Sequence, residues 1–391
     1  MASGLTKTES GLPMARMPPT GHTFSLITKV TRICNLRCHY CNEWEDTKTV
    51  MSFRTLAQLT NRALGHPDAK AVTFIWHGGE PLVRGRDFYN KALYLQKHCR
   101  RDRQTVKNAI QTNGTLVNAD WARYFNRHNW DVGLSMDGPR QLHDAHRPRI
   151  GGRGSYDSAV RAIDEFQNHS VRFGVLVVVT DDTLELGPDE MFDWLIARGI
   201  QSFAFLRLRP PSLPDVTYDP EADYLAMHRF NEYERRVFDR WYELDDERIG
   251  VREYDTILSA LVGGTPTICT MAGNCTGRHL GVNVNGDIYH CDRYVTDRDY
   301  HLGNVHRNTF AEMFDGEQVR TLKQRNAERV RGYADCPWLS ICNGGCPHDA
   351  YIAARSPGYD PTCCGKAPLI EHIHGRLLET LEAAAQTTSV T

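Results

Sequence analysis

The chain has 391 residues, of which 41% are hydrophobic and 24% charged, a composition typical of globular proteins that excludes a wholly disordered chain. Its 46 Lys and Arg and 48 Asp and Glu give a formal net charge of −2, so no basic excess indicates binding to nucleic acid or to an anionic membrane. No run approaches the roughly 18 apolar residues of a membrane helix, and the N-terminus lacks the apolar core of a signal peptide. We therefore expect a cytoplasmic protein with no membrane partner.

After residues 1–20, which we expect to form a flexible tail, β-like runs alternate with helical patterns. The predicted strands are 25–30, 71–76, 106–112, 132–135, 173–180 and 202–206. The predicted helices are 52–64, 87–99, 119–127, 156–167 and 188–198, with Ser52 and Ser155 as N-caps. Six β-α units in sequence imply an α/β fold with a parallel sheet, open or curved into a partial (β/α)6 TIM-like barrel. In such sheets the chemistry collects at the carboxyl ends of the strands.

The Pro-rich stretch 209–214 ends the alternating region, and a long helical pattern follows over residues 221–244. An apolar stripe along this pattern, which includes Phe230, Tyr233 and Val237, indicates core packing. We divide the chain into the tail, a barrel over residues 21–210, a helical bridge over residues 211–260, and a cysteine-rich module with a C-terminal helix over residues 261–391.

Cysteine is the residue that most restricts the possible functions. The chain has 12, and in a reducing compartment closely spaced cysteines are more often metal ligands or catalysts than disulfides. Three lie at positions 34, 38 and 41, and eight lie between positions 269 and 364. Cys99 stands alone in a helical pattern, where we expect a buried structural role.

The first cysteine cluster follows the first predicted strand. Cys34, Cys38 and Cys41 are spaced C-x3-C-x2-C. A zinc site would need a fourth ligand, and His39 lies inside the loop, too close to its neighbours to complete a good tetrahedron. Three thiolates on a short loop suit a cubane iron–sulfur cluster better, because one iron then lacks a protein ligand and can bind a substrate.

With Tyr40 directly before the last cysteine, this loop resembles the signature of radical S-adenosylmethionine (SAM) enzymes. The resemblance implies a 4Fe–4S cluster with an open site, on which SAM binds and is cleaved to a 5′-deoxyadenosyl radical. It also implies that Gly78, Gly79, Glu80 and Pro81, which follow the second predicted strand, hold the SAM amino group. Glycines allow close backbone approach, and a carboxylate can pair with an ammonium.

Two further strand ends resemble segments that line the SAM pocket in this family. Asn113 ends the third predicted strand, and Ser135 and Asp137 end the fourth. Ser135 would contact the ribose or the carboxylate of SAM. Arg147 and Arg153 are candidates for the SAM carboxylate, with a solvated role equally open for either. Each segment alone is ordinary turn chemistry, but polar groups at four consecutive strand ends indicate one site.

The C-terminal cysteines resemble the SPASM extension of radical SAM enzymes, which carries one or two auxiliary 4Fe–4S clusters. Zinc knuckles are the simpler alternative. By the resemblance, the ligands of the first auxiliary cluster would be Cys269, Cys275, Cys291 and Cys346. Those of the second would be Cys336, Cys342 and Cys364.

The second auxiliary cluster departs from the family pattern C-x2-C-x5-C-x3-C, because Tyr333 stands where the first cysteine falls. Three interpretations are open. Cys363 could compensate, although two adjacent cysteines on one cluster strain the backbone. An iron could be left open, or the cluster could be absent or altered. We favour a cluster with an unusual or open site.

The segment 286–295, followed by 302–305, resembles the anaerobic sulfatase-maturating enzymes. In that family, the aspartate directly after the cysteine is the proposed general base, and here Asp292 follows Cys291. A carboxylate near a metal cluster and a substrate can accept a proton if its pKa is suitable. A cap or a surface pair is the simpler role for this residue.

The family resemblance covers roughly residues 25–365 and fixes the substrate poorly. Our leading hypothesis is oxidative modification of a ribosomally made precursor peptide, with cross-linking such as cyclophane formation favoured. The alternative is formylglycine formation on Cys or Ser of a sulfatase. A zinc-stapled interaction scaffold represents a different class. An electron donor such as flavodoxin or ferredoxin is implied. With about twenty residues before the first strand, we expect a precursor to dock on the barrel, on the module, or on another protein.

Overall fold

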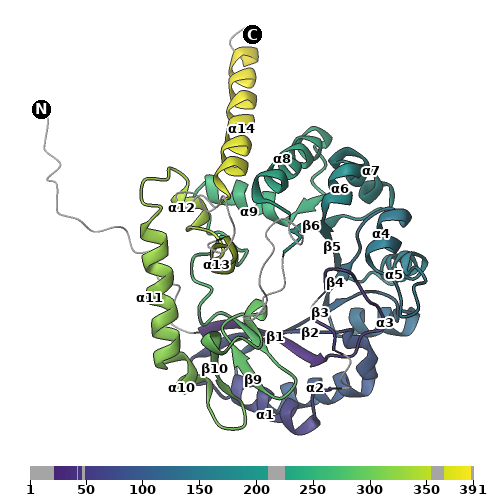
Figure 1. Ribbon diagram of the computed structural model, residues 1–391, viewed down its shortest axis with the longest axis vertical. Coiled ribbons are helices and arrows are strands. Elements are labelled where there is room, and N and C mark those ends of the chain that lie inside the picture. Colours follow the sequence, from purple (N-terminus) through teal and green to yellow (C-terminus); the bar gives the residue numbers. More distant parts are fainter. Residues whose placement is uncertain (1–21, 42, 46–48, 210–224, 354–364, 389–391) are drawn as a thin grey trace, which may run out of the picture.

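The structure is a computed structural model that describes residues 22–41, 43–45, 49–209, 225–353 and 365–388. A curved sheet with helices on its outer side forms the body of the molecule (Figure 1). Its central part consists of six parallel strands in chain order: β1 (His22–Thr31), β2 (Ala69–Gly78), β3 (Thr105–Thr112), β4 (Asp131–Ser135), β5 (Phe173–Val179) and β6 (Ser202–Arg207). The predicted α/β partial barrel is confirmed.

Five of the helices that connect these strands start within two residues of a predicted start, and η1, α4 and α6 are three short additions. They are α1 (Phe53–Leu64), η1 (Pro81–Arg84), α2 (Gly85–Cys99), α3 (Ala119–Arg127), α4 (Arg140–His146), α5 (Tyr156–Asn168), α6 (Asp181–Leu186) and α7 (Pro188–Ala197). Ser52 caps α1, because its hydroxyl accepts from the amide of Thr55 at 3.0 Å. Ser155 stands at the N-cap position of α5 but makes no side-chain cap. Its hydroxyl donates instead to the carbonyl of Arg147 at 2.6 Å.

Alternation along the strands separates a dry outer layer from a polar inner face. From residue 71 of β2 onward, Trp76 and the other even-numbered residues are buried, whereas His77 and the other odd-numbered residues are half-buried. Trp76 packs against Tyr89 of α2 and against Trp130, with ring centroids 5.8 and 6.3 Å apart. The apolar core therefore lies between sheet and helices, and the inner face is left for polar chemistry.

The C-terminal module extends the sheet at its β1 edge. β8 (His279–Val282) pairs in parallel with β1, and β9 (Asp287–Tyr289) and β10 (His301–Asn304) continue it antiparallel. At the other edge, the two-residue β7 (Gly250–Val251) pairs with β6. The sequence predicted none of these strands. They place the module beside the cysteine loop, which follows β1. The division at residues 210 and 260 stays a prediction.

The remaining helices follow β6. They are α8 (Met227–Leu244), α9 (Arg252–Leu261), η2 (Asp292–Tyr294), η3 (Arg298–Tyr300), α10 (Phe310–Phe314), α11 (Glu317–Arg331), α12 (Leu339–Cys342), α13 (Pro347–Ala353) and α14 (Ala367–Thr388), which projects away from the body (Figure 1). Phe230, Tyr233 and Val237 of α8 are buried, as the apolar stripe predicts. Cys99 is half-buried at the end of α2 and packs against the core. Within the described ranges, no helix has the length and apolarity to span a membrane. The predicted tail, Cys363 and Cys364 lie outside the described residues.

Candidate active site

The predicted cysteine loop directly follows β1, at the barrel edge where the parallel strands end. Cys34, Cys38 and Cys41 are all half-buried. The amide of Leu36 donates to the sulfur of Cys34, and that of Glu43 to the sulfur of Cys41, both at 3.4 Å. Burial raises the pKa of Cys34 to about 12 and the pKa of Cys38 to about 11. These thiols are therefore protonated at neutral pH unless a metal cation replaces the protons.

The spacing of the sulfurs favours a cluster over a single zinc ion. Zn–S bonds of about 2.3 Å in a tetrahedron place sulfurs about 3.8 Å apart. In the part of the chain that the structure describes, Glu43, His77 and Asp292 form the only trio of His, Cys, Asp or Glu ligand atoms mutually within 4.8 Å. No three cysteine sulfurs are that close there. Three thiols on one loop at a wider spacing fit a cluster in which each sulfur binds a different iron.

Gly78 and Gly79 pack against the start of the cysteine loop. The amide of Gly79 donates to the carbonyl of Thr31 at 2.9 Å, and the amide of Glu80 donates to that of Ile33 at 2.8 Å. A Cβ on Gly78 would lie 2.2 Å from the carbonyl oxygen of Thr31, and one on Gly79 would lie 2.3 Å from that of Ile33. The close approach predicted for these glycines thus occurs between two segments of the chain itself.

Glu80 is fully buried and connects the end of β2 to the end of β3. Its carboxylate accepts from the amides of Leu82 and Asn113 and from the hydroxyl of Thr112, at 2.8 to 2.9 Å. Burial raises the pKa of Glu80 to about 7, against the lowering effect of these three donors. A carboxylate has about four acceptor positions, so one remains for an ammonium. Pro81 begins the short helix η1 and is buried.

Tyr40, Asp137 and Arg147 form one buried cluster. The hydroxyl of Tyr40 donates to Asp137, and Arg147 donates to both carboxylate oxygens at 2.9 and 3.1 Å. Burial alone would raise the pKa of Asp137, but the charge and hydrogen bonds of Arg147, with smaller contributions from His143 and Tyr40, lower it overall. The Arg147 guanidinium lies 5.3 Å from the centre of the Tyr40 ring. Arg147 therefore has a partner within the chain, and the solvated alternative does not hold for it.

The other predicted SAM-pocket residues have different surroundings. The amide group of Asn113 donates to Asn35 at 3.0 Å and to the sulfur of Cys34 at 3.8 Å. Ser135 is half-buried at the end of β4 and accepts from Gln111 at 2.8 Å. Arg153 is exposed on the connection between α4 and α5. Asn113 thus contacts the cysteine loop, Ser135 lies at the carboxyl end of β4, and Arg153 is on the surface.

Asp292 begins η2, directly after Cys291, and lies beside the barrel. Its carboxylate is 2.5 Å from the ammonium of Lys29 on β1. Burial alone would raise the pKa of Asp292, but the charge and hydrogen bond of Lys29, together with the nearby His77 and Arg32, lower it overall. Asp292 is therefore an ionised carboxylate at neutral pH, and it links the module to the barrel rather than acting as a surface pair.

The four cysteines predicted for the first auxiliary cluster influence one another electrostatically. Burial raises the pKa of Cys275 to about 12, and the nearby Cys346 and Cys269 add to the effect. Burial also raises the pKa of Cys291 well above its usual value, with further contributions from Asp292, Cys346 and Cys269. The structure thus brings together four thiols that lie up to 77 positions apart in the sequence, as a shared cluster requires.

The residues predicted for the second auxiliary cluster are only partly described. Cys336 is half-buried and its amide donates to the carbonyl of Tyr333 at 2.9 Å. Cys342 is buried at the end of α12. Cys363 and Cys364 lie outside the described residues, so the choice between them stays open.

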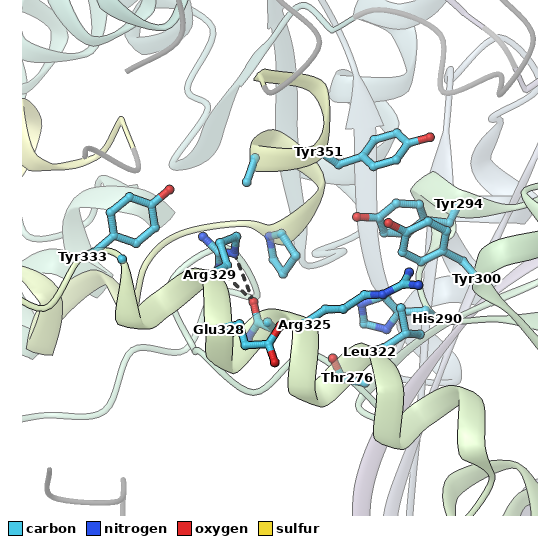
Figure 2. Close-up of a pocket in the computed structure, with 14 residues that line it drawn as sticks. Thr276, His290, Tyr294, Tyr300, Leu322, Arg325, Glu328, Arg329, Tyr333 and Tyr351 are labelled. Carbon is cyan, nitrogen blue, oxygen red and sulfur yellow. Dashed lines mark hydrogen bonds between the residues drawn. The ribbon is translucent and has the colours of Figure 1, made fainter. Parts of the chain in front are cut away.

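A pocket of about 490 Å³ adjoins the first auxiliary cysteines. Three of its lining residues, Thr276, His290 and Pro347, are chain neighbours of Cys275, Cys291 and Cys346. Figure 2 shows Tyr294, Tyr300 and Tyr351 at one end, Tyr333 at the other, and Arg325 and Arg329 of α11 between them. The rings of Tyr294 and Tyr300 stack with centroids 3.6 Å apart. This pocket is large enough for a small ligand or a side chain of a substrate.

The sequence analysis missed Lys29, Glu43 and His77, which surround Asp292. Lys29 is fully buried and contacts all three of the others. A lysine inside a predicted buried strand was the available signal, because a buried lysine is rare without a partner.

A partial α/β barrel with three cysteines after its first strand, followed by a module that gathers four more, defines an iron–sulfur enzyme of the radical SAM class. Comparison with known proteins agrees. Residues 28–191 match the radical SAM superfamily, and residues 269–347 match the SPASM iron–sulfur cluster-binding domain.

Two curated relatives extend the comparison. The serine-type anaerobic sulfatase-maturating enzyme of Bacteroides thetaiotaomicron is 31% identical over 373 residues, which cover 90% of this chain and 89% of the relative. The cysteine-type enzyme of Clostridium perfringens is 29% identical over 342 residues, covering 84% and 89%. The solved structure of native anSMEcpe with bound AdoMet and Kp18Cys peptide is 26% identical with a TM-score of 0.80, and the match covers 93% of this chain and 100% of that one.

The chain belongs to the radical SAM superfamily, in the SPASM-containing family that includes the anaerobic sulfatase-maturating enzymes. It is therefore an enzyme that acts on a protein or a peptide. This membership favours the radical SAM enzyme over the alternative of a zinc-stapled interaction scaffold. Iron–sulfur clusters and SAM, the cofactors that the sequence predicts, are those of the family.

Proposed function

We propose that the protein oxidises a side chain within a peptide segment bound at the carboxyl edge of the barrel, with formylglycine formation on Cys or Ser as the first candidate reaction. The observation that carries the proposal is the position of Asp292. This carboxylate belongs to the cysteine module, yet it lies at the barrel edge, 2.5 Å from Lys29 of β1. Sulfatase-maturating enzymes among the relatives support this reaction over the cross-linking that the sequence favoured.

Each group of residues would have its own role in this reaction. Cys34, Cys38 and Cys41 would hold the first cluster, and Cys269, Cys275, Cys291 and Cys346 the first auxiliary one. When bound, the clusters and SAM supply abstraction of one hydrogen atom from the substrate carbon and acceptance of one electron. Asp292 would take the proton that leaves the substrate. The side chain then loses two electrons and two hydrogens in all. A Ser substrate gives the aldehyde directly, and a Cys substrate exchanges its sulfur with water and releases hydrogen sulfide.

Glu80, Tyr40, Asp137 and Arg147 would shape the SAM pocket. Glu80 has one acceptor position left for the SAM ammonium. Asp137 is neutralised by Arg147, so the pair would orient Tyr40 and the last turn of the cysteine loop rather than bind the SAM carboxylate. Ser135 and Asn113, at the ends of β4 and β3, would contact the rest of SAM.

Cross-linking of a precursor peptide is the second candidate reaction. The observation that favours it is Tyr333, which stands in place of a cysteine and changes the second auxiliary site relative to the family pattern. Both reactions remove two electrons from the peptide, so they use the same cofactors. The proposal also includes a cytoplasmic location and flavodoxin or ferredoxin as the electron donor. It keeps the domain division at residues 20, 210 and 260.

A peptide assay separates the two reactions. The protein is reconstituted without oxygen and given SAM, dithionite, and either a sulfatase-derived peptide with Cys or Ser or a candidate precursor peptide encoded nearby. An aldehyde trapped by a hydrazide reagent supports formylglycine formation. Loss of two hydrogens without a trapped aldehyde supports a cross-link. Deoxyadenosine without a change in either peptide would contradict both.

A further inference from the structure

Lys29 is a cation inside the wall of the barrel. Its side chain is 0% exposed, and in the parallel register of β1 and β2 it lies beside His77. Its ammonium is 2.6 Å from the carboxylate of Glu43 and 2.5 Å from that of Asp292, and it donates to Nδ1 of His77 at 3.3 Å. A buried lysine requires such partners, because an unpaired charge in this position would be strongly disfavoured.

These contacts join four segments that the sequence keeps apart. Lys29 comes from β1, Glu43 from the loop just after Cys41, His77 from the end of β2 just before Gly78, and Asp292 from η2 of the cysteine module. Arg32 donates to the same carboxylate oxygen of Glu43 as Lys29, at 3.3 Å, and also donates to Asn283 of the module at 3.1 Å. The ammonium of Lys29 therefore fixes Asp292, the proposed proton acceptor, relative to the cysteine loop. It also fixes Asp292 relative to the end of β2, where SAM is proposed to bind.

A divalent cation is the alternative centre for this group. The ligand atoms of Glu43, His77 and Asp292 lie within 4.8 Å of one another, which suits a metal ion. The ammonium of Lys29 already contacts all three residues, and it supplies the positive charge that the two carboxylates need. The cation of this site is therefore Lys29.

The exposed fractions of the side chains assign different roles to Lys29 and to the two carboxylates. The side chains of Asp292 and Glu43 are 21% and 28% exposed, whereas that of Lys29 is inaccessible. A substrate can reach the carboxylates but not the ammonium. Without Lys29, two carboxylates within 4.8 Å would repel each other, and Asp292 would lose the contact that orients it.

We propose that Lys29 is a positioning residue that holds Asp292 toward the substrate and thereby sets how often hydrogen abstraction leads to product. This inference rests on the proposed function, because it takes Asp292 as the proton acceptor. Lys29 acts through Asp292 and does not itself touch the substrate.

The test compares Lys29→Met, Lys29→Arg and a control, Arg101→Met. Arg101 also anchors β2, but at its opposite end, where it donates to the carbonyls of Pro67 and Ala69 at 2.6 and 2.9 Å. Two quantities are measured on the reconstituted proteins. The first is product formed per deoxyadenosine. The second is hydrogen–deuterium exchange of segment 290–295 in the absence of peptide.

For Lys29→Met we expect product per deoxyadenosine to fall about 10-fold or more, because a misplacement of a reacting group by about 1 Å can cost about 10²-fold in rate. Exchange in segment 290–295 should rise. Lys29→Arg should recover most of the product per deoxyadenosine and most of the protection from exchange, and Arg101→Met should keep the wild-type values of both. In the Asp292→Asn protein, adding Lys29→Met should not lower product per deoxyadenosine any further. If Lys29→Met does not fold, Lys29→Gln carries the same comparison.

Two results would overturn the inference: a wild-type ratio in Lys29→Met, or a lower ratio with unchanged exchange in segment 290–295. Failure of the proposed function gives a different pattern. In that case the wild-type protein itself makes deoxyadenosine and no product, while the exchange measurement still decides whether Lys29 fixes the Asp292 segment.

Discussion

Replacing Asp137 with Asn tests the buried cluster beneath the cysteine loop. Asp137 is 0% and Arg147 6% exposed, and the pair shares two hydrogen bonds of 2.9 and 3.1 Å. Asp137 also accepts from the hydroxyl of Tyr40 and from the amide of Val178. The substitution leaves the Arg147 charge buried without a counter-ion. Removing one partner of such a pair costs about 3–5 kcal/mol.

The assay is denaturant unfolding followed by tryptophan fluorescence, with free energies taken from the midpoints at a common slope. Asp137→Asn should lower the free energy of unfolding by about 3–5 kcal/mol, and Asp137→Asn combined with Arg147→Met should lower it less, because no unpaired charge remains. Asp157→Asn removes an exposed partner of Arg140 and should leave the midpoint unchanged. A loss below about 1 kcal/mol for Asp137→Asn would refute the account of this cluster.

The same pair predicts a dependence on pH. Because Arg147 holds the pKa of Asp137 below its usual value, the pair stabilises the fold fully above the unfolded pKa of about 3.9. This stabilisation is lost as pH falls through the lower pKa of the folded protein. Unfolding measured between these limits should therefore depend less on pH in Asp137→Asn than in the wild-type protein. An identical dependence would contradict the assignment.

Three further predictions concern the clusters and the proton acceptor. Gly79→Ala should lower the amount of bound iron, because its Cβ would lie 2.3 Å from the carbonyl oxygen of Ile33. The control Gly375→Ala should bind iron normally, because its Cβ would meet nothing within 4 Å. Equal iron in the two variants would contradict the packing argument. Asp292→Asn should lower product per deoxyadenosine by about 10²–10⁴-fold, the usual contribution of a general base, and a wild-type ratio would dismiss that role. Tyr333→Cys should abolish the change that added azide makes to the electron paramagnetic resonance spectrum of the auxiliary clusters, since it supplies the missing ligand. A wild-type spectrum insensitive to azide would contradict an open iron.

The strands and the first cysteine loop could be predicted because their signals are local. Apolar runs of strand length alternate with helical patterns, and the C-x3-C-x2-C spacing lies within eight residues. Ser52 could be assigned as a cap for the same reason. Ser155 could not, because its hydroxyl is used by Arg147 in a contact that only the tertiary structure creates.

The group around Asp292 shows what the sequence does not contain. Lys29 and Asp292 are far apart in the chain, and nothing near either residue indicates the other. Their contact arises because β8 of the module pairs with β1 of the barrel, and strands as short as β8 give no clear period. Arg147 was a candidate for the SAM carboxylate on its charge alone, and only the structure shows that Asp137 already occupies its guanidinium.

The central claim is that the loop at Cys34, Cys38 and Cys41 carries the cluster that cleaves SAM. The most direct measurement is deoxyadenosine formed after anaerobic reconstitution and reduction with dithionite. It compares the wild-type protein with the triple variant Cys34→Ala, Cys38→Ala and Cys41→Ala. We predict deoxyadenosine from the wild type and none from the triple variant, which keeps only the iron of the auxiliary sites. Deoxyadenosine at the wild-type level from the triple variant, or zinc without iron in the wild type, would contradict the account.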